Sequence, residues 1–144
     1  MKPQGLSIGN IVEVNHFEYG DMFASVTSIN DVGDLCLHLL DERFTKEEYE
    51  CTMNEVVPIP ITEELLTKIG FILPEHKEFY VMCRINGKDN SIRLTRYFNL
   101  WNAEIFASHP EVVMLEHTIK GLRFVHELQN AYYLVTGKEL EIKL

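Results

Sequence analysis

The segment from Leu122 to Thr136 carries the clearest periodic pattern in the sequence. At about 100° per residue, one broad arc contains most of its apolar side chains, namely Leu122, Val125, Leu128, Ala131, Tyr132, Tyr133 and Val135, with Phe124 at the margin. Arg123, Glu127 and Asn130 fall on the opposite side, and Gly137 follows directly, where a left-handed residue commonly ends a helix. The pattern predicts a long amphipathic C-terminal helix that packs against a core.

Residues 5–61 show a different pattern, in which short apolar stretches alternate with turn-forming residues. The expected strands are 11–14, 22–29, 35–40 and 55–59, and the charged run 41–50 is expected to be an exposed connection. Short strands at this spacing, joined by tight turns, are typical of a small antiparallel β-barrel of the SH3-like kind.

The C-terminal part of the chain is expected to mix helices and strands. Thr62–Gly70 is predicted to be a short helix, because threonine suits its N-cap, two glutamates follow, and glycine suits its end. Further expected elements are a hairpin at 79–97, a strand at 112–116 and a terminal strand at 139–144.

The predicted fold class is therefore α+β. We expect an N-terminal SH3-like β-barrel subdomain (1–61) and an α+β subdomain (62–144) packed on it, forming one compact unit. The second subdomain would contain the short helix, an antiparallel hairpin or sheet, and the long C-terminal helix with its terminal strand.

The composition is that of a folded chain with an acidic surface. Among 144 residues, 46% are hydrophobic and 24% are charged, which is typical of a globular domain. The net charge of −9 disfavours binding to duplex nucleic acid, whose partners usually present a basic face. No signal peptide and no stretch long enough to cross a bilayer are recognised, so we expect a cytoplasmic protein that does not enter membranes.

Neither the cysteines nor the histidines predict a metal site. Cys36, Cys51 and Cys83 form no CxxC pair, and no two of the six histidines have helical or strand spacing for a shared ligand. The strings GxGxxG, HExxH and GxSxG are missing as well. We therefore predict no cofactor and no metal, and an enzyme with a dispersed site around His117 or His126 ranks last.

The hairpin at 79–97 offers a candidate ligand site. One register sets Arg84 opposite Arg93 and Tyr80 opposite Tyr97. Two directly opposed arginines are unfavourable unless an anion lies between them, and flanking tyrosines can stack a base. This register predicts a small platform for a nucleotide or another anion.

A second register of the same hairpin predicts no ligand. A tight turn at Asn86-Gly87 would set Arg84 against Asp89, which is an ordinary cross-strand ion pair. The sequence does not choose between the two registers.

His126 and Gln129 are polar residues at the edge and inside of the apolar arc. A polar group in a buried stripe needs hydrogen-bond partners. The functional interpretation is a ligand contact or a general base. The structural interpretation, which we favour, is that both side chains bond to backbone groups of nearby strands and fix the position of the helix.

Three stretches of the chain share a further feature. They are Ile8-Gly9-Asn10, Pro58–Leu66 followed by Gly70-Phe71, and Phe124–Leu140. Together they resemble a family of small uncharacterised proteins encoded by phages and prophages of gut Bacteroidetes, with a divergent stretch between Pro74 and Leu115. The resemblance implies a phage or mobile-element context and no active site.

Three functional hypotheses follow. The leading one is a non-enzymatic interaction module of phage or mobile-element origin, which binds a host or phage protein through exposed β-edges or its acidic surface. The second is a small-ligand binder, such as a nucleotide-sequestering anti-defence protein, and the third is an enzyme with a dispersed site. The sequence leaves open whether the chain forms homo-oligomers.

Overall fold

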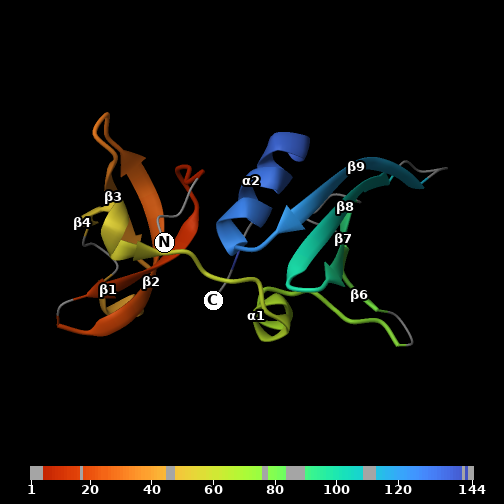
Figure 1. Ribbon diagram of the computed structural model, residues 1–144, viewed down its shortest axis with the longest axis horizontal. Coiled ribbons are helices and arrows are strands. Elements are labelled where there is room, and N and C mark those ends of the chain that lie inside the picture. The colour runs from red at the N-terminus through yellow and green to blue at the C-terminus, as the bar shows by residue number, and fades with distance from the viewer. Residues whose placement is uncertain are drawn as a thin grey trace. The chain divides into compact units, whose positions relative to one another are not determined.

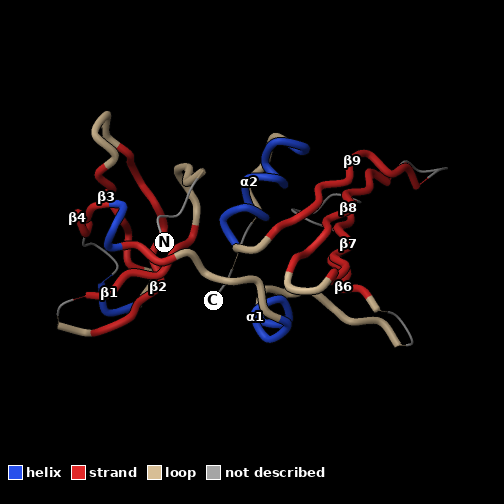
Figure 2. The backbone as a smooth tube through the Cα atoms, in the orientation of Figure 1, coloured by secondary structure: helices blue, strands red, loops and turns tan. Residues whose placement is uncertain are grey.

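The computed structural model describes residues 5–16, 18–44, 48–75, 78–83, 90–108, 113–140 and 142. Half of the described residues lie in strands, which form two antiparallel sheets (Figures 1 and 2). The chain divides into two compact units. The first comprises Met1–Pro60 and Phe124–Asn130, and the second comprises Ile61–Arg123 and Ala131–Leu144.

The first unit contains a five-stranded sheet in the order β4–β3–β2–β1–β5, with every neighbouring pair antiparallel. Its strands are β1 (Ile11–His16), β2 (Gly20–Ile29), β3 (Asp34–Leu39), β4 (Glu48–Thr52) and β5 (Val56–Val57). Two short 3-10 helices, η1 (Glu42–Phe44) and η2 (Met53–Glu55), flank β4 along the chain.

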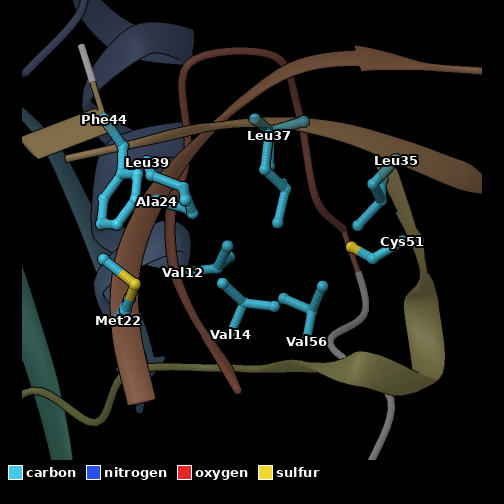
Figure 3. Packing of buried hydrophobic residues seen from close by; sticks show 11 residues of the cluster. Val12, Val14, Met22, Ala24, Leu35, Leu37, Leu39, Phe44, Cys51 and Val56 are labelled. Carbon is cyan, nitrogen blue, oxygen red and sulfur yellow. The ribbon is translucent and has the colours of Figure 1, made fainter. Parts of the chain in front are cut away.

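One face of this sheet packs its apolar side chains into a core. Alternate residues of β1, β2 and β3 are buried, because successive side chains of a strand point to opposite faces. The side chains that meet in the interior are those of Val12, Val14, Met22, Ala24, Val26, Leu35, Leu37, Leu39, Phe44, Cys51 and Val56 (Figure 3).

The turn between β2 and β3 follows from its sequence. The Asn30 side-chain oxygen accepts hydrogen bonds from the backbone N–H groups of Val32 (3.1 Å) and Asp34 (2.8 Å). Gly33 has a φ of 88°, a conformation that glycine adopts without steric cost. The turn-forming residues expected between the strands at 22–29 and 35–40 therefore do form a turn.

The second unit contains a four-stranded antiparallel sheet in the order β6–β7–β8–β9. Its strands are β6 (Phe79–Cys83), β7 (Asn90–Tyr97), β8 (Leu100–Ser108) and β9 (Val113–Leu122). Two α-helices complete the described elements: α1 (Glu63–Lys68) and α2 (Val125–Thr136), the latter divided between the two units.

The short helix α1 begins and ends as predicted. The Thr62 hydroxyl accepts a hydrogen bond from the N–H of Leu65 (3.2 Å), which satisfies one of the donors at the helix start. Gly70 follows the helix with a φ of 104°.

The predicted α+β fold class, with a barrel and a long helix, is wrong. The structure is mostly β, and the described residues contain only two short α-helices, of 6 and 12 residues. Within that same part of the chain no closed barrel forms, because β4 and β5 lie at opposite ends of their sheet and do not pair. Strand number and turn spacing do not specify whether a sheet closes on itself.

The C-terminal helix is also shorter than predicted. Leu122 is the last residue of β9, and α2 begins at Val125. The backbone N–H of Phe124 donates to the Glu127 carboxylate (3.1 Å), which caps the helix start. Leu122 and Phe124 extend the helical pattern in the sequence only because both are apolar. Pairing between β8 and β9 places Leu122 in a strand instead.

Three further expectations need correction. The charged run 41–50 contains η1 and the start of β4, and β4 tolerates its glutamates because an edge strand exposes one side to water. Residues 113–116 of the predicted strand at 112–116 belong to the longer β9, and residue 112 lies outside the described part. In the expected terminal strand at 139–144, Glu139, Leu140 and Ile142 do not lie in a strand, and the other three residues fall outside the described part.

Strand β8 was not predicted at all. Trp101, Ala103 and Ile105 are buried, whereas the intervening Asn102 and Glu104 are partly exposed. This alternation is that of a half-buried strand, so the signal is present in the sequence.

Candidate functional site

The turn between β7 and β8 combines an unusual backbone with exposed aromatic side chains. Tyr97 pairs with Leu100, so only Phe98 and Asn99 form the loop. Phe98 has a φ of 57°, and it is the one described non-glycine residue with a positive φ. Two-residue hairpin loops place glycine or asparagine at such positions, because bulky residues are strained there.

Two contacts of Arg96 hold this turn in place. Its Nε donates to the carbonyl oxygen of Phe98 (3.0 Å), and its Nη1 lies 3.4 Å from the carboxylate of Glu63 in α1. Both partners are exposed, so the ion pair adds little stability by itself. It nevertheless fixes the direction of a side chain that bonds to the strained residue.

The aromatic rings at the turn face water. Tyr97 is 62% exposed and Phe98 is 80% exposed. The two rings meet edge to face, with centroids 4.8 Å apart. We call Tyr97 and Phe98 the aromatic turn, and it presents two neighbouring apolar rings that the fold itself does not bury.

The segment that includes α1 fixes the neighbouring sheet residues. The Trp101 indole N–H donates to the carbonyl oxygen of Ile61 (3.1 Å), and the Tyr80 ring packs edge-on to Trp101 with centroids 5.8 Å apart. Burial raises the pKa of the Tyr80 hydroxyl. The charge of Glu63 and the hydrogen bond between Tyr80 and Glu63 raise this pKa further. Tyr80 and Arg96 thus both contact Glu63, which links α1 to the sheet.

The predicted platform of tyrosines and arginines does not assemble. The structure sets Tyr80 opposite Leu94 and Arg93 opposite Val81, so neither of the two registers proposed from the sequence is present. Neighbouring residues of a strand point to opposite faces, and Arg93 therefore lies on the face opposite to Tyr80. Tyr97 belongs to the aromatic turn, and Arg84 falls outside the described residues.

Arg93 already has partners within its own sheet. Its guanidinium forms an ion pair with Glu104, the residue directly opposite it on β8. The same guanidinium lies over the rings of Phe79 (5.1 Å to the centroid) and Phe106 (5.3 Å). A carboxylate thus takes the place that the predicted anion would occupy, and the nucleotide hypothesis loses its geometric support.

Gln129 has the structural role that we favoured. Its side-chain oxygen accepts from the N–H of Ile11 (2.9 Å), and its amide donates to the carbonyl oxygen of Gly9 (3.3 Å). The neighbouring Asn130 donates to the carbonyl oxygen of Gly5 (2.5 Å) and accepts from the side chain of Asn10 (2.8 Å). These bonds attach the first half of α2 to the chain leading into β1.

His126 is buried beside Phe124, and the two rings stack with centroids 5.8 Å apart. His117, on β9, is exposed and lies opposite Ile105. In the part of the chain that the structure describes, no group of three histidine, cysteine or acidic side chains is arranged to hold a metal. Neither described helix is long and apolar enough to cross a membrane.

The sequence pattern points to Tyr97 but not to Phe98. The predicted hairpin ends at Tyr97, and the pattern assigns no element to the residues that follow. The signal is the string Tyr97-Phe98-Asn99-Leu100 between two alternating stretches, which has turn length but lacks glycine. Once both strands are recognised, the sequence alone places an aromatic residue in the two-residue loop. An aromatic residue at such a position indicates a strained backbone.

Comparison with known proteins adds no relative. No protein-family model, curated protein or solved structure matches this chain. The resemblance to phage and prophage proteins therefore stays a prediction.

Proposed function

We propose that the chain is a non-enzymatic interaction module of phage or mobile-element origin, which works in the host cytoplasm and binds a host or phage protein. The observation that carries the proposal is the aromatic turn, where exposed Phe98 has a positive φ beside exposed Tyr97. The three stretches that resemble phage and prophage proteins support the proposed origin.

The strain at Phe98 needs an explanation outside the fold. A non-glycine residue in the left-handed region costs about 1–3 kcal/mol, and such residues gather at functional sites. Glycine would remove this cost, and little burial would be lost because the ring is exposed. A partner that buries the ring explains why an aromatic residue stands there, since large aromatic side chains dominate interface energetics.

The sheet edges are less suited to binding a partner by strand addition. On the outermost strand β9, two register shifts each insert an extra residue, and such bulges interrupt edge pairing. The outer side of β6 is occupied by Ile72, which exchanges two backbone hydrogen bonds with Val81 (2.9 and 2.8 Å). In the other sheet, β4 carries Glu48 and Glu50, and β5 has only two residues. Docking through the side chains of the aromatic turn is therefore favoured.

Capture from host and phage-infected lysates tests this proposal. The baits are the wild-type chain, Phe98→Gly, and Leu134→Ser, which removes an equally exposed apolar side chain on α2. An unrelated protein of similar negative charge serves as the background. We expect a protein that binds wild type and Leu134→Ser above background, and that Phe98→Gly no longer retains.

Two results would count against the proposal. One is that no protein is enriched over the acidic background. The other is that Phe98→Gly retains the same proteins as the wild type, which would mean that the aromatic turn is not the contact surface.

A further inference from the structure

Among the described residues, four rings gather at one end of the first sheet, and we call them the aromatic cluster. His16 ends β1, Tyr19 directly precedes β2, Phe44 ends η1, and Tyr49 lies in β4. The centroid of the His16 ring lies 5.1 Å from the ring centroid of Tyr19, 5.2 Å from that of Tyr49 and 6.2 Å from that of Phe44. The centroids of Tyr19 and Phe44 are 4.8 Å apart.

The cluster has a buried base and an exposed side. His16 and Phe44 are buried, and the Phe44 side chain also belongs to the core of the sheet (Figure 3). Nδ1 of His16 accepts a hydrogen bond from the N–H of Glu18 (3.2 Å), which helps to orient the imidazole ring. Tyr19, in contrast, is 47% exposed. The rings therefore form a fixed base with one aromatic side chain open to water.

A guanidinium lies on this surface. The Cζ atom of Arg43 is 5.5 Å from the centroid of Tyr19 and 5.5 Å from that of Phe44. Asp41 holds the same guanidinium with both carboxylate oxygens, at 2.9 Å to Nε and 2.7 Å to Nη2. These hydrogen bonds hold the pKa of Asp41 well below its usual range, at about 2, so the carboxylate is charged at neutral pH.

Aromatic rings beside a carboxylate are groups that suit the binding of an arginine side chain. Arginine stacks on aromatic rings, and its planar fork matches a carboxylate through two parallel hydrogen bonds. The present occupant is a residue only two positions from Asp41, with a side chain that is 64% exposed. Exposed pairs of this kind contribute little to stability, so the fold does not depend on keeping Arg43 in place.

We propose that the aromatic cluster and Asp41 form a binding site for an arginine side chain in a basic segment of a partner protein, with Arg43 occupying the site in its absence. The chain's net charge of −9 and the exposed Glu18, Glu42 and Glu48 favour a basic partner. All these groups belong to the first unit, so the site is independent of the aromatic turn in the second.

Removing the Arg43 side chain should strengthen the binding of an external arginine. If Arg43 competes with an external arginine, replacing Arg43 raises the fraction of molecules whose site is open. The apparent affinity for the external arginine should then rise by a factor on the order of five. A structural ion pair makes no such prediction, because its loss would leave binding unchanged or weaker.

NMR titration of the full chain with short peptides tests this inference. The probes are acetyl-Gly-Arg-Gly-amide and its lysine and citrulline counterparts, and the readout is the shift of the Tyr19 and His16 ring signals. The variants are Arg43→Ala and Arg43→Gln, with Arg123→Ala as a matched control. We expect the arginine peptide to bind both Arg43 variants several times more tightly than wild type and Arg123→Ala, and the citrulline peptide not to bind.

A double variant keeps the test decisive. Tyr19→Leu combined with Arg43→Ala should abolish binding, while its urea unfolding midpoint shows that the sheet is intact. The proposal is overturned if the arginine peptide binds no variant, if both Arg43 variants bind like wild type, or if the lysine or citrulline peptide binds equally well. Retained binding in the double variant overturns it as well.

Discussion

Gln129 shows how one buried side chain joins parts of the chain that are distant in sequence. Its amide bonds to the backbone of Gly9 and Ile11, more than a hundred residues away. The sequence identified this residue because a polar side chain stands out inside an apolar arc. The partners could not be named, because no local pattern indicates which backbone groups a helix will meet.

The Gln129→Ala variant is expected to be destabilised by about 1–3 kcal/mol, since two backbone groups at the start of β1 lose their partner. Tyr133→Ser, at an exposed position of the same helix, should change stability by less than about 0.5 kcal/mol. Urea unfolding of both variants measures the difference. Equal stability of Gln129→Ala and wild type would show that water replaces these bonds without cost.

Cys51 makes stability depend on alkaline pH. Burial raises the pKa of its thiol from 9.0 to about 11, with smaller contributions from Glu55, Cys36 and Asp34. Below pH 9 the thiol is neutral in both states, and between pH 9 and 11 only the unfolded thiol ionises. The free energy of unfolding should therefore fall as the pH rises through this window.

The urea midpoint measured from pH 8 to pH 10.5 checks this prediction. The Cys51→Ala variant should lose part of the pH slope, whatever its absolute stability. Some slope will remain, because burial also raises the pKa of Tyr49 and Tyr80. An unchanged slope in Cys51→Ala would exclude this thiol as the cause.

At the scale of elements, local patterns predicted those elements that depend on neighbouring residues. The strands near 11–14 and 22–29 and the helix α1 are present because alternation and caps act over a few residues. The start of α2 and strand β8 were not predicted correctly. The start of α2 depends on pairing between distant segments, because Leu122 lies opposite Trp101 at the end of β9. Strand β8, in contrast, has a local alternation in the sequence that was not recognised.

The N-cap of α1 should contribute measurably to that helix. Thr62→Ala removes the acceptor for the Leu65 N–H and is expected to cost about 1 kcal/mol. Thr67→Ala is the control, because the Thr67 hydroxyl only bonds back to the carbonyl oxygen of Glu63 and alanine is the better helix former.

Hydrogen exchange of the α1 amides distinguishes the two threonine variants. Faster exchange in Thr62→Ala than in Thr67→Ala is the expected order. The reverse order would mean that packing of the buried Leu66, and not the cap, sets the stability of this helix.

At the scale of the molecule, the fold class was predicted incorrectly because it depends on how segments combine. The chain passes from the first unit to the second after Pro60 and returns after Arg123. At these two passages Val125 N–H donates to Ile59 (2.8 Å), and Ile61 N–H donates to Arg123 (2.9 Å). Continuous domains such as 1–61 and 62–144 are the natural expectation from a sequence, which contains no local sign of this return.

We expect the aromatic turn to lower the stability of the whole molecule, because the strain at Phe98 is kept for binding. Phe98→Gly relieves the left-handed strain and should stabilise the fold by about 1 kcal/mol, or about 3 °C in Tm. Phe98→Ala removes the ring and keeps the strain, so its stability should stay at or below that of wild type. Both variants should lose the partner captured by wild type.

The most direct test is the thermal and urea unfolding of Phe98→Gly beside wild type and Phe98→Ala, using protein from the same preparations as the capture experiment. We expect Phe98→Gly to be the most stable of the three and to bind no partner. A Phe98→Gly variant that is less stable than wild type would show that the fold itself needs the ring, and would contradict the claim that Phe98 is kept for binding.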